Sequence, residues 1–319
     1  MDTTSLRVAL GKLRRKLTFW RVLALSAIGA LLLAMLQWRA DGVIREDHVA
    51  RVRVDGFILG REEKIDLIDR LAEKKDVRAV IVRINSPGGT TSGSEALYKA
   101  LRRVAEKKPV VTVMDGIATS GGYMTALAGE RMFAGGNTIT GSIGVIVQWP
   151  EVHELLTRLG VKMQAVRSGP LKALPNSVEP TPPAARRVIE EMVRDSYEWF
   201  ISLVAERRGL DIEKVRQLAD GRVYTGRQAL KAGLVDALGD ERVARRWLEK
   251  THKIAFSIKV REYRPERPLL RQLGLSGVAS RMLGMAGLEE VVARLFAPGA
   301  RVDGLLSVWH PEATIAGER

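Results

Sequence analysis

The sequence predicts an α/β fold built around a parallel β-sheet. Two buried β-type runs, 78–84 and 110–114, alternate with helical patterns over 65–71 and 94–107, and the links between them are short. This order favours a parallel sheet because parallel strands need crossover connections. A glycine-containing turn directly follows each of the two strands. The loops after the carboxyl ends of strands are where open α/β sheets place their active sites.

Length and composition limit the possible classes of protein. The 319 residues are 46% hydrophobic and 28% charged, enough for one large core or two modest ones. Cysteine is absent, so the chain has no disulfide, thiolate metal ligand or cysteine nucleophile. The net charge of +14 suits nucleic acid or an anionic membrane surface. Only 5% of residues are aromatic and no nucleic-acid-binding signature is present, so we expect no nucleic acid, whereas binding of anionic lipid stays open.

The first 39 residues predict a membrane anchor. Residues 1–17 form a basic tail, and residues 18–39, with an uncharged run from Val22 to Gln37, form one transmembrane helix. A cleaved signal peptide is the competing interpretation, but the apolar run is not followed by the small residues of a cleavage site. A buried helix of a soluble protein is the plainer alternative. The positive-inside rule keeps the basic tail in the cytoplasm and places the bulk of the chain across the membrane. Residues 40–48 then form a polar linker.

Hydrophobic periodicity predicts the remaining elements. Ile65, Ile68 and Leu71 recur on one face of the first amphipathic helix. Thr225 is expected to cap a short helix that ends at Gly233. Further strands are expected over 49–54, 139–147 and 254–260, further helices over 123–129, 151–159, 184–208 and 241–250, and proline-rich irregular structure over 176–183.

The residues after 261 form a C-terminal extension, 262–319, whose role the sequence does not assign. Leu269 to Phe296 combines leucines, methionines and glycines with scattered charges. Such a segment suits amphipathic helices that lie on a membrane, pack on a neighbouring subunit or close the core of the domain. Residues 311–319 are expected to form a frayed end.

The stretch around Ser120 is the strongest candidate for chemistry. The strand over 110–114 is followed by a short turn, Ser120, two glycines and a predicted helix. A strand, a tight turn and a helix start expose a serine hydroxyl, and the glycines let a substrate carbonyl approach the backbone N–H groups. The alternative is an ordinary Ser-Gly-Gly turn that caps a helix.

A nucleophilic serine needs a base, and no histidine lies in a motif that marks it as catalytic. The four histidines are His48, His153, His252 and His310. A histidine distant in sequence would still complete a triad. Lysine is a base only when it is neutral, which requires burial that lowers its pKa. Lys172 lies among Leu171, Ala173 and Leu174 in a loop restrained by a glycine and two prolines, so it is the best candidate. A lysine in an ordinary surface loop is the alternative.

Four motifs follow one another along the chain: Asn85-Ser-Pro-Gly-Gly89, Ser120-Gly-Gly-Tyr123, Ser168-Gly-Pro-Leu-Lys172 and Gly221-Arg-Val-Tyr-Thr-Gly226. Together they resemble bacterial signal peptide peptidase A, a family of membrane-bound serine–lysine proteases. The resemblance implies Ser120 as nucleophile, Lys172 as general base and Ser142 as the residue that orients the lysine amine. It also implies that the backbone N–H groups of Gly88 and Gly121 form the oxyanion hole.

The resemblance further implies a serine–lysine protease domain over residues 49–261, with the fold of the Clp protease and crotonase group, a spiral of repeated β-β-α units. The expected activity is cleavage of remnant signal peptides and other unfolded apolar segments. The expected location is the bacterial inner membrane, with the catalytic domain on the extracytoplasmic side. We expect no metal, nucleotide or other cofactor. A catalytically silent membrane scaffold and a crotonase-type acyl-coenzyme A enzyme are the alternatives on the same fold.

The family also implies a homo-oligomer, a ring or dome such as an octamer, with active sites shared between neighbours. Lys172 would then serve either its own Ser120 or that of a neighbour, and the sequence leaves this open.

Overall fold

In the computed structural model, residues 16–32, 46–265 and 306–308 are described, the last three as backbone. The chain divides into two compact units, Met1–Glu46 and Asp47–Arg319. In the first unit, residues 16–32 form a helix with exposed apolar side chains. The rest of the predicted anchor, the basic tail up to residue 15 and most of the linker lie outside the described residues. Among the residues that are described, no helix combines the length and the apolar character needed to cross a membrane.

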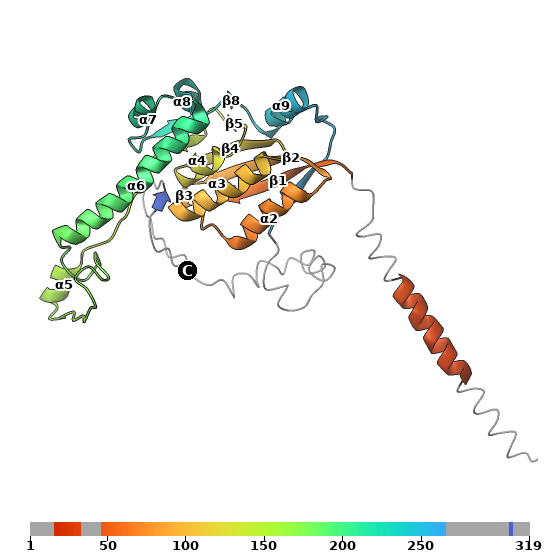
Figure 1. The fold of residues 1–319 in the computed structure, drawn as a ribbon, viewed down its shortest axis with the longest axis horizontal. Coiled ribbons are helices and arrows are strands. Elements are labelled where there is room, and N and C mark those ends of the chain that lie inside the picture. Colours follow the sequence, from red (N-terminus) through yellow and green to blue (C-terminus); the bar gives the residue numbers. More distant parts are fainter. Residues whose placement is uncertain (1–15, 33–45, 266–305, 309–319) are drawn as a thin grey trace, which may run out of the picture. The chain divides into compact units, whose positions relative to one another are not determined.

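The second unit is built on a mixed, mainly parallel sheet (Figure 1). Its central strands run in the order β7-β6-β4-β2-β1-β9, and β5 pairs with both β4 and β8. Among its described strands, β6 and β7 alone pair in antiparallel fashion. The strands of this sheet are β1 (His48–Asp55), β2 (Val77–Ser86), β4 (Val110–Thr119), β5 (Arg131–Ala134), β6 (Ile139–Gly141), β7 (Val223–Thr225), β8 (Ala237–Leu238) and β9 (Val260–Tyr263). The predicted parallel α/β architecture is confirmed.

Helices cover both faces of this sheet (Figure 1). They are α2 (Glu62–Glu73), α3 (Thr91–Ala105), α4 (Gly121–Ala126), α5 (His153–Arg158), α6 (Pro183–Arg208), α7 (Ile212–Leu218), α8 (Gly226–Ala232) and α9 (Glu241–His252). On one face, α2, α3, α4 and the end of α6 bury side chains such as Ile68, Leu101 and Phe200. On the other, α9 buries Leu248 against Phe133. Each such side chain contributes about 1.5–3 kcal/mol when it leaves water.

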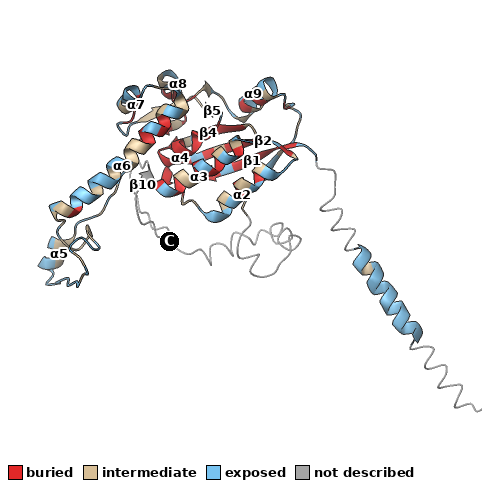
Figure 2. Ribbon diagram, in the orientation of Figure 1, coloured by how far each residue is buried: buried red, intermediate tan, exposed pale blue. Residues whose placement is uncertain are grey.

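Helix α6 is packed on the sheet only near its C-terminal end. Most of its buried residues, including Phe200 and Val204, lie in that part, whereas its N-terminal half is largely exposed (Figure 2). The segment 148–182, which includes α5 and is here called the outer arm, lies around that exposed end (Figure 1). The arm is tied to itself by hydrogen bonds such as Trp149 Nε1 to Thr181 Oγ1 at 3.1 Å.

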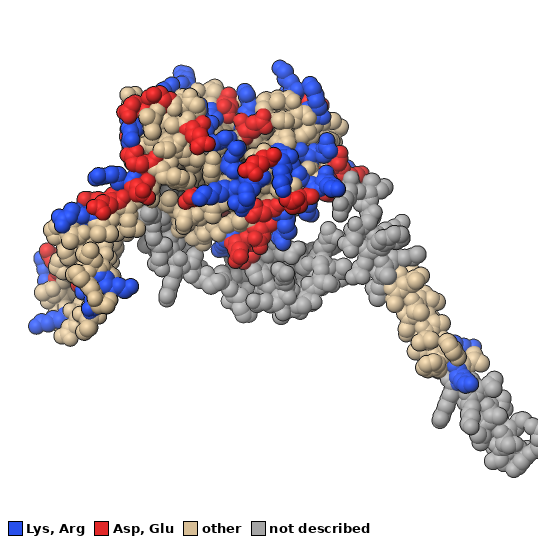
Figure 3. Space-filling model, viewed as in Figure 1, with Lys and Arg blue, Asp and Glu red and all other residues tan. Residues whose placement is uncertain are grey.

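Charges of both signs are mixed over the face seen in Figure 3. Ion pairs join α2 to α3, among them Arg103 with Asp69 at 2.7 Å. The positive net charge of the chain therefore does not appear as a patch of one sign on this face.

Two predicted strands are corrected by the structure. The strand expected over 139–147 ends at Gly141, because Ser142 takes a φ of 49° that interrupts an extended ladder. The strand expected over 254–260 is a turn, and the pairing strand β9 begins only at Val260. Ile254 lies in the apolar cluster beside α9 and donates its N–H to Leu248 O, so its burial comes from packing on a helix.

Candidate active site

Ser120 lies in a strained turn between β4 and α4. Its backbone has φ 52° and ψ −115°, a region that L-residues other than glycine rarely adopt. Such a conformation costs about 1–3 kcal/mol and persists only where the surrounding structure holds it. The residue is 1% exposed, its N–H donates to Gly141 O at 2.7 Å, and its C=O accepts from Met124 N–H at 2.8 Å. The fold therefore stores local strain at the predicted nucleophile.

The turn that carries Ser120 is in close contact with the Asn-Ser-Pro-Gly-Gly turn after β2. A Cβ atom added at Gly122 would lie 2.7 Å from Ser86 O, so only glycine fits there without a shift. Thr119 Oγ1 donates to Pro87 O at 3.1 Å from the same side. The two glycine-containing turns are therefore neighbours in space, as their positions after adjacent parallel strands predict.

The backbone N–H groups of Gly121 and Gly88, the two predicted oxyanion donors, differ in their hydrogen-bond partners. Gly121 begins α4, so its N–H is among the first four that have no partner within a helix. Gly88 has a φ of 111°, and its N–H donates to Ser86 Oγ at 3.1 Å. Ser86 Oγ in turn donates to Gly56 O at 2.6 Å. A substrate oxygen would have to replace this hydroxyl as the acceptor of the Gly88 N–H.

Ser142 lies directly beside the serine turn. It follows Gly141, the residue that pairs with Thr119 across β6 and β4 and accepts the N–H of Ser120. Ser142 is 7% exposed and donates its own N–H to Arg222 O at 2.8 Å. Two buried serines with positive φ thus stand at the ends of adjacent parallel strands. The predicted role of Ser142 in orienting the lysine amine stays a prediction.

Lys172 lies in the outer arm, and its surroundings differ from the sequence-based expectation. The residue is exposed, and its neighbour Leu171 is 42% exposed. Its backbone N–H donates to Gly169 O at 3.2 Å, within the same loop. The expectation that adjacent apolar residues would bury this amine is therefore wrong for a single chain. Local sequence supplies the apolar side chains, but burial requires a surface packed over them.

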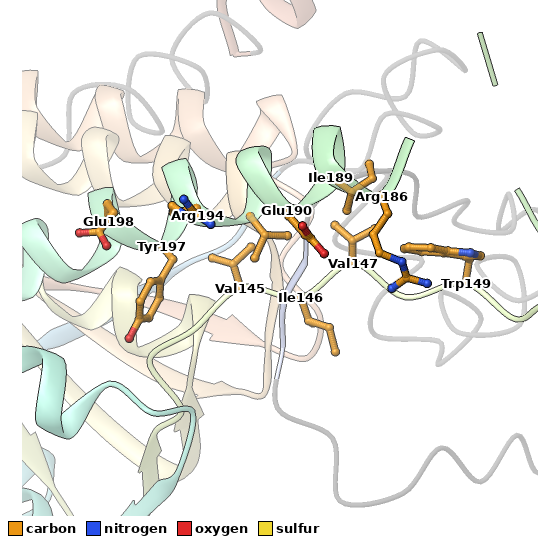
Figure 4. A pocket seen from close by; sticks show the side chains of 11 residues that line it. Val145, Ile146, Val147, Trp149, Arg186, Ile189, Glu190, Arg194, Tyr197 and Glu198 are labelled. Atoms are coloured by element: carbon orange, nitrogen blue, oxygen red, sulfur yellow. The ribbon is translucent and has the colours of Figure 1, made fainter. Parts of the chain in front are cut away.

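An apolar groove of about 590 Å³ leads from the end of β6 towards the outer arm (Figure 4). Its strand-side wall begins three residues after Ser142 with Val145 and Val147, and Ile189 of α6 lies opposite. Charged side chains of α6 such as Arg186 and Glu190 border it. The groove, lined by side chains of the segment after Ser142 and of α6, has the chemistry to hold apolar side chains.

Within the described part of the second unit, most of the strongly exposed large apolar side chains lie on the outer arm and the adjoining parts of the chain. They are Ile146, Leu155, Leu159, Val161, Met163, Val166, Leu171, Val188 and Met192, each more than 40% exposed. Contiguous exposed apolar surface in a globular protein indicates a binding surface.

Contacts with more distant parts of the chain hold the serine helix in place. Tyr123 is fully buried and donates its hydroxyl to Leu234 O at 2.8 Å. Arg207, at the end of α6, donates to Leu127 O at 2.9 Å and to Gly129 O at 3.1 Å, which satisfies carbonyls just after α4. Sequence analysis did not identify Arg207. Its place in the last turn of α6 would indicate contacts with carbonyls of that helix, whereas the carbonyls that it binds follow α4.

Comparisons with known proteins give the family. The model of peptidase family S49 matches residues 102–255, and the model of Clp protease matches residues 63–138. "Putative protease slr0021" of Synechocystis sp. is 37% identical over 247 residues, which are 76% of this chain and 88% of that protein. "Serine protease SPPA, chloroplastic" of Arabidopsis thaliana is 31% identical over 257 residues, 79% of this chain and 38% of that protein. A solved structure of a ClpP1 mutant from Listeria monocytogenes covers 60% of this chain and 91% of its own, with 18% identity and a TM-score of 0.40.

The residues that the S49 model matches include the serine turn, Ser142 and the lysine loop. The family models and the relatives confirm the resemblance to signal peptide peptidase A that the four motifs indicated. The chain therefore belongs to peptidase family S49 and is a protease.

Proposed function

We propose that the chain is a serine endopeptidase in which Ser120 is the nucleophile. The observation that carries this proposal is the buried, strained conformation of Ser120 in contact with a second glycine-containing turn. Strain of this kind is concentrated at functional sites, where it sets the direction of a side chain. The two turns supply backbone N–H groups on either side of the place where a substrate carbonyl would enter.

The proposed reaction uses Lys172 as the general base. Its neutral amine takes the proton of the Ser120 hydroxyl while the serine oxygen attacks the carbonyl carbon of the scissile peptide bond. The N–H groups of Gly88 and Gly121 then bind the oxyanion, and each such donor is worth about 3–4 kcal/mol. The lysine ammonium protonates the leaving amine, and water hydrolyses the acyl-enzyme. Ser142, beside Ser120, would accept a hydrogen bond from the amine and so orient it.

We further propose that Lys172 acts on Ser120 of a second copy of the chain. The exposure of Lys172 and the exposed apolar surface of the outer arm support this arrangement. Packing against a second copy would remove the amine from water, as a neutral lysine base requires. A ring of copies, in which each arm reaches the next, is the closed form of such a head-to-tail contact.

The test combines two inactive variants. Ser120→Ala and Lys172→Ala are each expected to lose cleavage of an unfolded, signal-peptide-like substrate while circular dichroism and oligomer size stay unchanged. When the two variants are co-assembled in equal amounts, about one quarter of the sites in a ring combine an intact serine with a neighbour's intact lysine. About one quarter of the wild-type activity should therefore return.

Persistent inactivity of the mixed assembly, with exchange of subunits verified by mass spectrometry, would show that the dyad forms within one chain. Cleavage by pure Ser120→Ala would remove this serine as the nucleophile.

The proposed substrates are remnant signal peptides and other unfolded segments with apolar residues, which the groove between Val145 and Ile189 would accommodate. We propose that residues 18–39 anchor the chain in the bacterial inner membrane, with the protease unit on the extracytoplasmic side. The exposed Phe19 and Trp20 on the described helix support this part of the proposal. The anchor predicts that the whole chain stays with membranes during an alkaline carbonate wash, whereas a chain without residues 1–39 is released.

A further inference from the structure

The motif from Gly221 to Gly226 supplies no group to the proposed reaction, yet its strand β7 lies next to the segment that carries Ser142. β7 pairs with β6 in antiparallel fashion, with Tyr224 opposite Thr140. β6 pairs on its other side with the end of β4, the strand that leads to the serine turn. β7 therefore supports β6 from the side that faces away from the serine turn.

The two serines with positive φ are each held by a carbonyl of the next segment in this order. Ser120 N–H donates to Gly141 O at 2.7 Å, and Ser142 N–H donates to Arg222 O, directly before β7, at 2.8 Å. Gly141 and Ser142 are consecutive, so a shift of this dipeptide moves Ser142 and the acceptor of the Ser120 N–H together. The placement of both serines therefore depends on what holds the dipeptide.

The ring of Tyr224 covers the backbone of Gly141. A Cβ atom added at Gly141 would lie 2.5 Å from Tyr224 Cδ2 and 3.1 Å from Tyr224 Cε2, so the ring occupies the space that a side chain at this position would need. An aromatic side chain that covers a glycine on the neighbouring strand is one of the contacts that pin strand register. The ring is thus in direct contact with the dipeptide that places the two serines.

The far end of the same ring is fixed as well. Tyr224 Oη donates to the carbonyl of Leu218, the last residue of α7, at 2.9 Å. The side chain is half-buried and packs on the larger apolar cluster. The ring therefore lies between the C-terminal end of α7 and the backbone of Gly141, and both contacts restrict its movement.

We propose that Tyr224 is a positioning residue of the protease: its ring fixes the Gly141–Ser142 dipeptide and, through Gly141 O, the serine turn. This inference rests on the proposed function for the roles of Ser120 and Ser142 in the reaction, whereas the packing of the ring does not depend on catalysis. Tyr224 acts through the two serines. Its effect on the rate follows from the small displacement, about 1 Å, that catalytic geometry tolerates.

The first test is a series of substitutions at Tyr224 in the whole chain. Tyr224→Phe keeps the ring and loses the hydrogen bond to Leu218 O, Tyr224→Leu keeps apolar volume without a ring, and Tyr224→Ala removes both. A misplacement of about 1 Å costs about 100-fold in rate, so kcat should fall at least about tenfold in Tyr224→Ala, less in Tyr224→Leu and least in Tyr224→Phe. The apolar groove is lined by other residues, so KM should stay close to that of the wild type in all three.

Tyr263→Ala is the matched control. Tyr263 is also half-buried, lies in β9 at the opposite edge of the sheet, and has its hydroxyl hydrogen-bonded to His48 Nε2 at 2.8 Å. A general loss of stability lowers the folded fraction of both alanine variants, whereas loss of positioning lowers kcat per folded molecule. We therefore expect wild-type kcat per folded molecule in Tyr263→Ala.

The second test needs no proteolysis. Hydrogen–deuterium exchange of the backbone amides of Ser120 and Ser142 is followed by mass spectrometry in the same variants. Both N–H groups are hydrogen-bonded in the wild type, so local opening of the dipeptide accelerates their exchange. Exchange at both serines should be faster in Tyr224→Ala and Tyr224→Leu, and unchanged in Tyr224→Phe and Tyr263→Ala.

Faster exchange at both serines together with a lower kcat supports Tyr224 as a positioning residue. If the wild type cleaves no substrate, the proposed function fails, and the exchange rates alone decide whether the ring fixes the serines. Wild-type kcat in Tyr224→Ala, an equal loss of kcat in Tyr263→Ala, or unchanged exchange at Ser120 and Ser142 overturns the inference.

Discussion

The contact between the two glycine-containing turns leads to a sharp prediction at Gly122. A Cβ atom at this position would lie 2.7 Å from Ser86 O, whereas ordinary contacts begin at 3.4 Å, so Gly122→Ala must separate the turns by about 0.7 Å. A misplacement of about 1 Å costs about 100-fold in rate, so this separation should lower kcat/KM about 20-fold. That loss equals about 2 kcal/mol in the activation barrier.

The effect of Gly122→Ala on stability is expected to be small, because two contributions oppose each other. Alanine favours the helical conformation over glycine by about 1 kcal/mol. Overpacking against the Ser86 carbonyl costs about 1–3 kcal/mol. The net loss of about 0–2 kcal/mol lowers Tm by no more than about 8 °C in a domain of this size. Activity should therefore fall far more than stability.

The assay compares kcat/KM on a signal-peptide-like substrate with Tm from differential scanning fluorimetry. Gly116→Ala is the matched control, because Gly116 lies in β4, the strand that leads to the serine turn, and its added Cβ would meet Asn85 Oδ1 at an ordinary 3.4 Å. A Gly122→Ala chain with wild-type kcat/KM would refute the argument that the two turns must stay in contact. Equal losses in both variants would show that any added methyl group in this region is harmful.

Three further changes test the elements that support the site. Arg207→Gln removes two charge-assisted hydrogen bonds to the carbonyls after α4, so kcat should fall with KM unchanged, and Arg207→Lys should restore part of kcat. Tyr123→Phe leaves the buried carbonyl of Leu234 without its donor, which should lower the free energy of unfolding in urea by about 1–3 kcal/mol. Burial also raises the pKa of Tyr123, so the unfolded chain loses this proton first, and the fall in stability above about pH 10 should be smaller in Tyr123→Phe. Thr225→Ala removes the capping box of α8 and should cost about 1 kcal/mol by the same urea titration, whereas Thr225→Ser should cost less.

Elements with local determinants were predicted well from the sequence. The short helix between Thr225 and Gly233 is confirmed because both ends depend on neighbours in sequence: a capping box at Thr225 and a left-handed backbone at Gly233. The buried strands β2 and β4 are confirmed because continuous apolar runs suit a sheet covered on both faces. The strand expected over 254–260 failed because an apolar residue packed on a helix and one paired in a strand look alike in a short run.

The sequence by itself determined the order of the motifs, the parallel α/β class and the family, because these depend on residue types and short spacings. Only the tertiary structure decided which turns meet, how Ser120 is strained, that Lys172 is exposed in a single chain, and that residues 306–308 pair with β3 (Gly88–Thr90). The physical reason is that burial and strand pairing are properties of surfaces. A lysine is buried, or a strand edge covered, only by residues that the chain brings from far away, and no local pattern specifies that encounter.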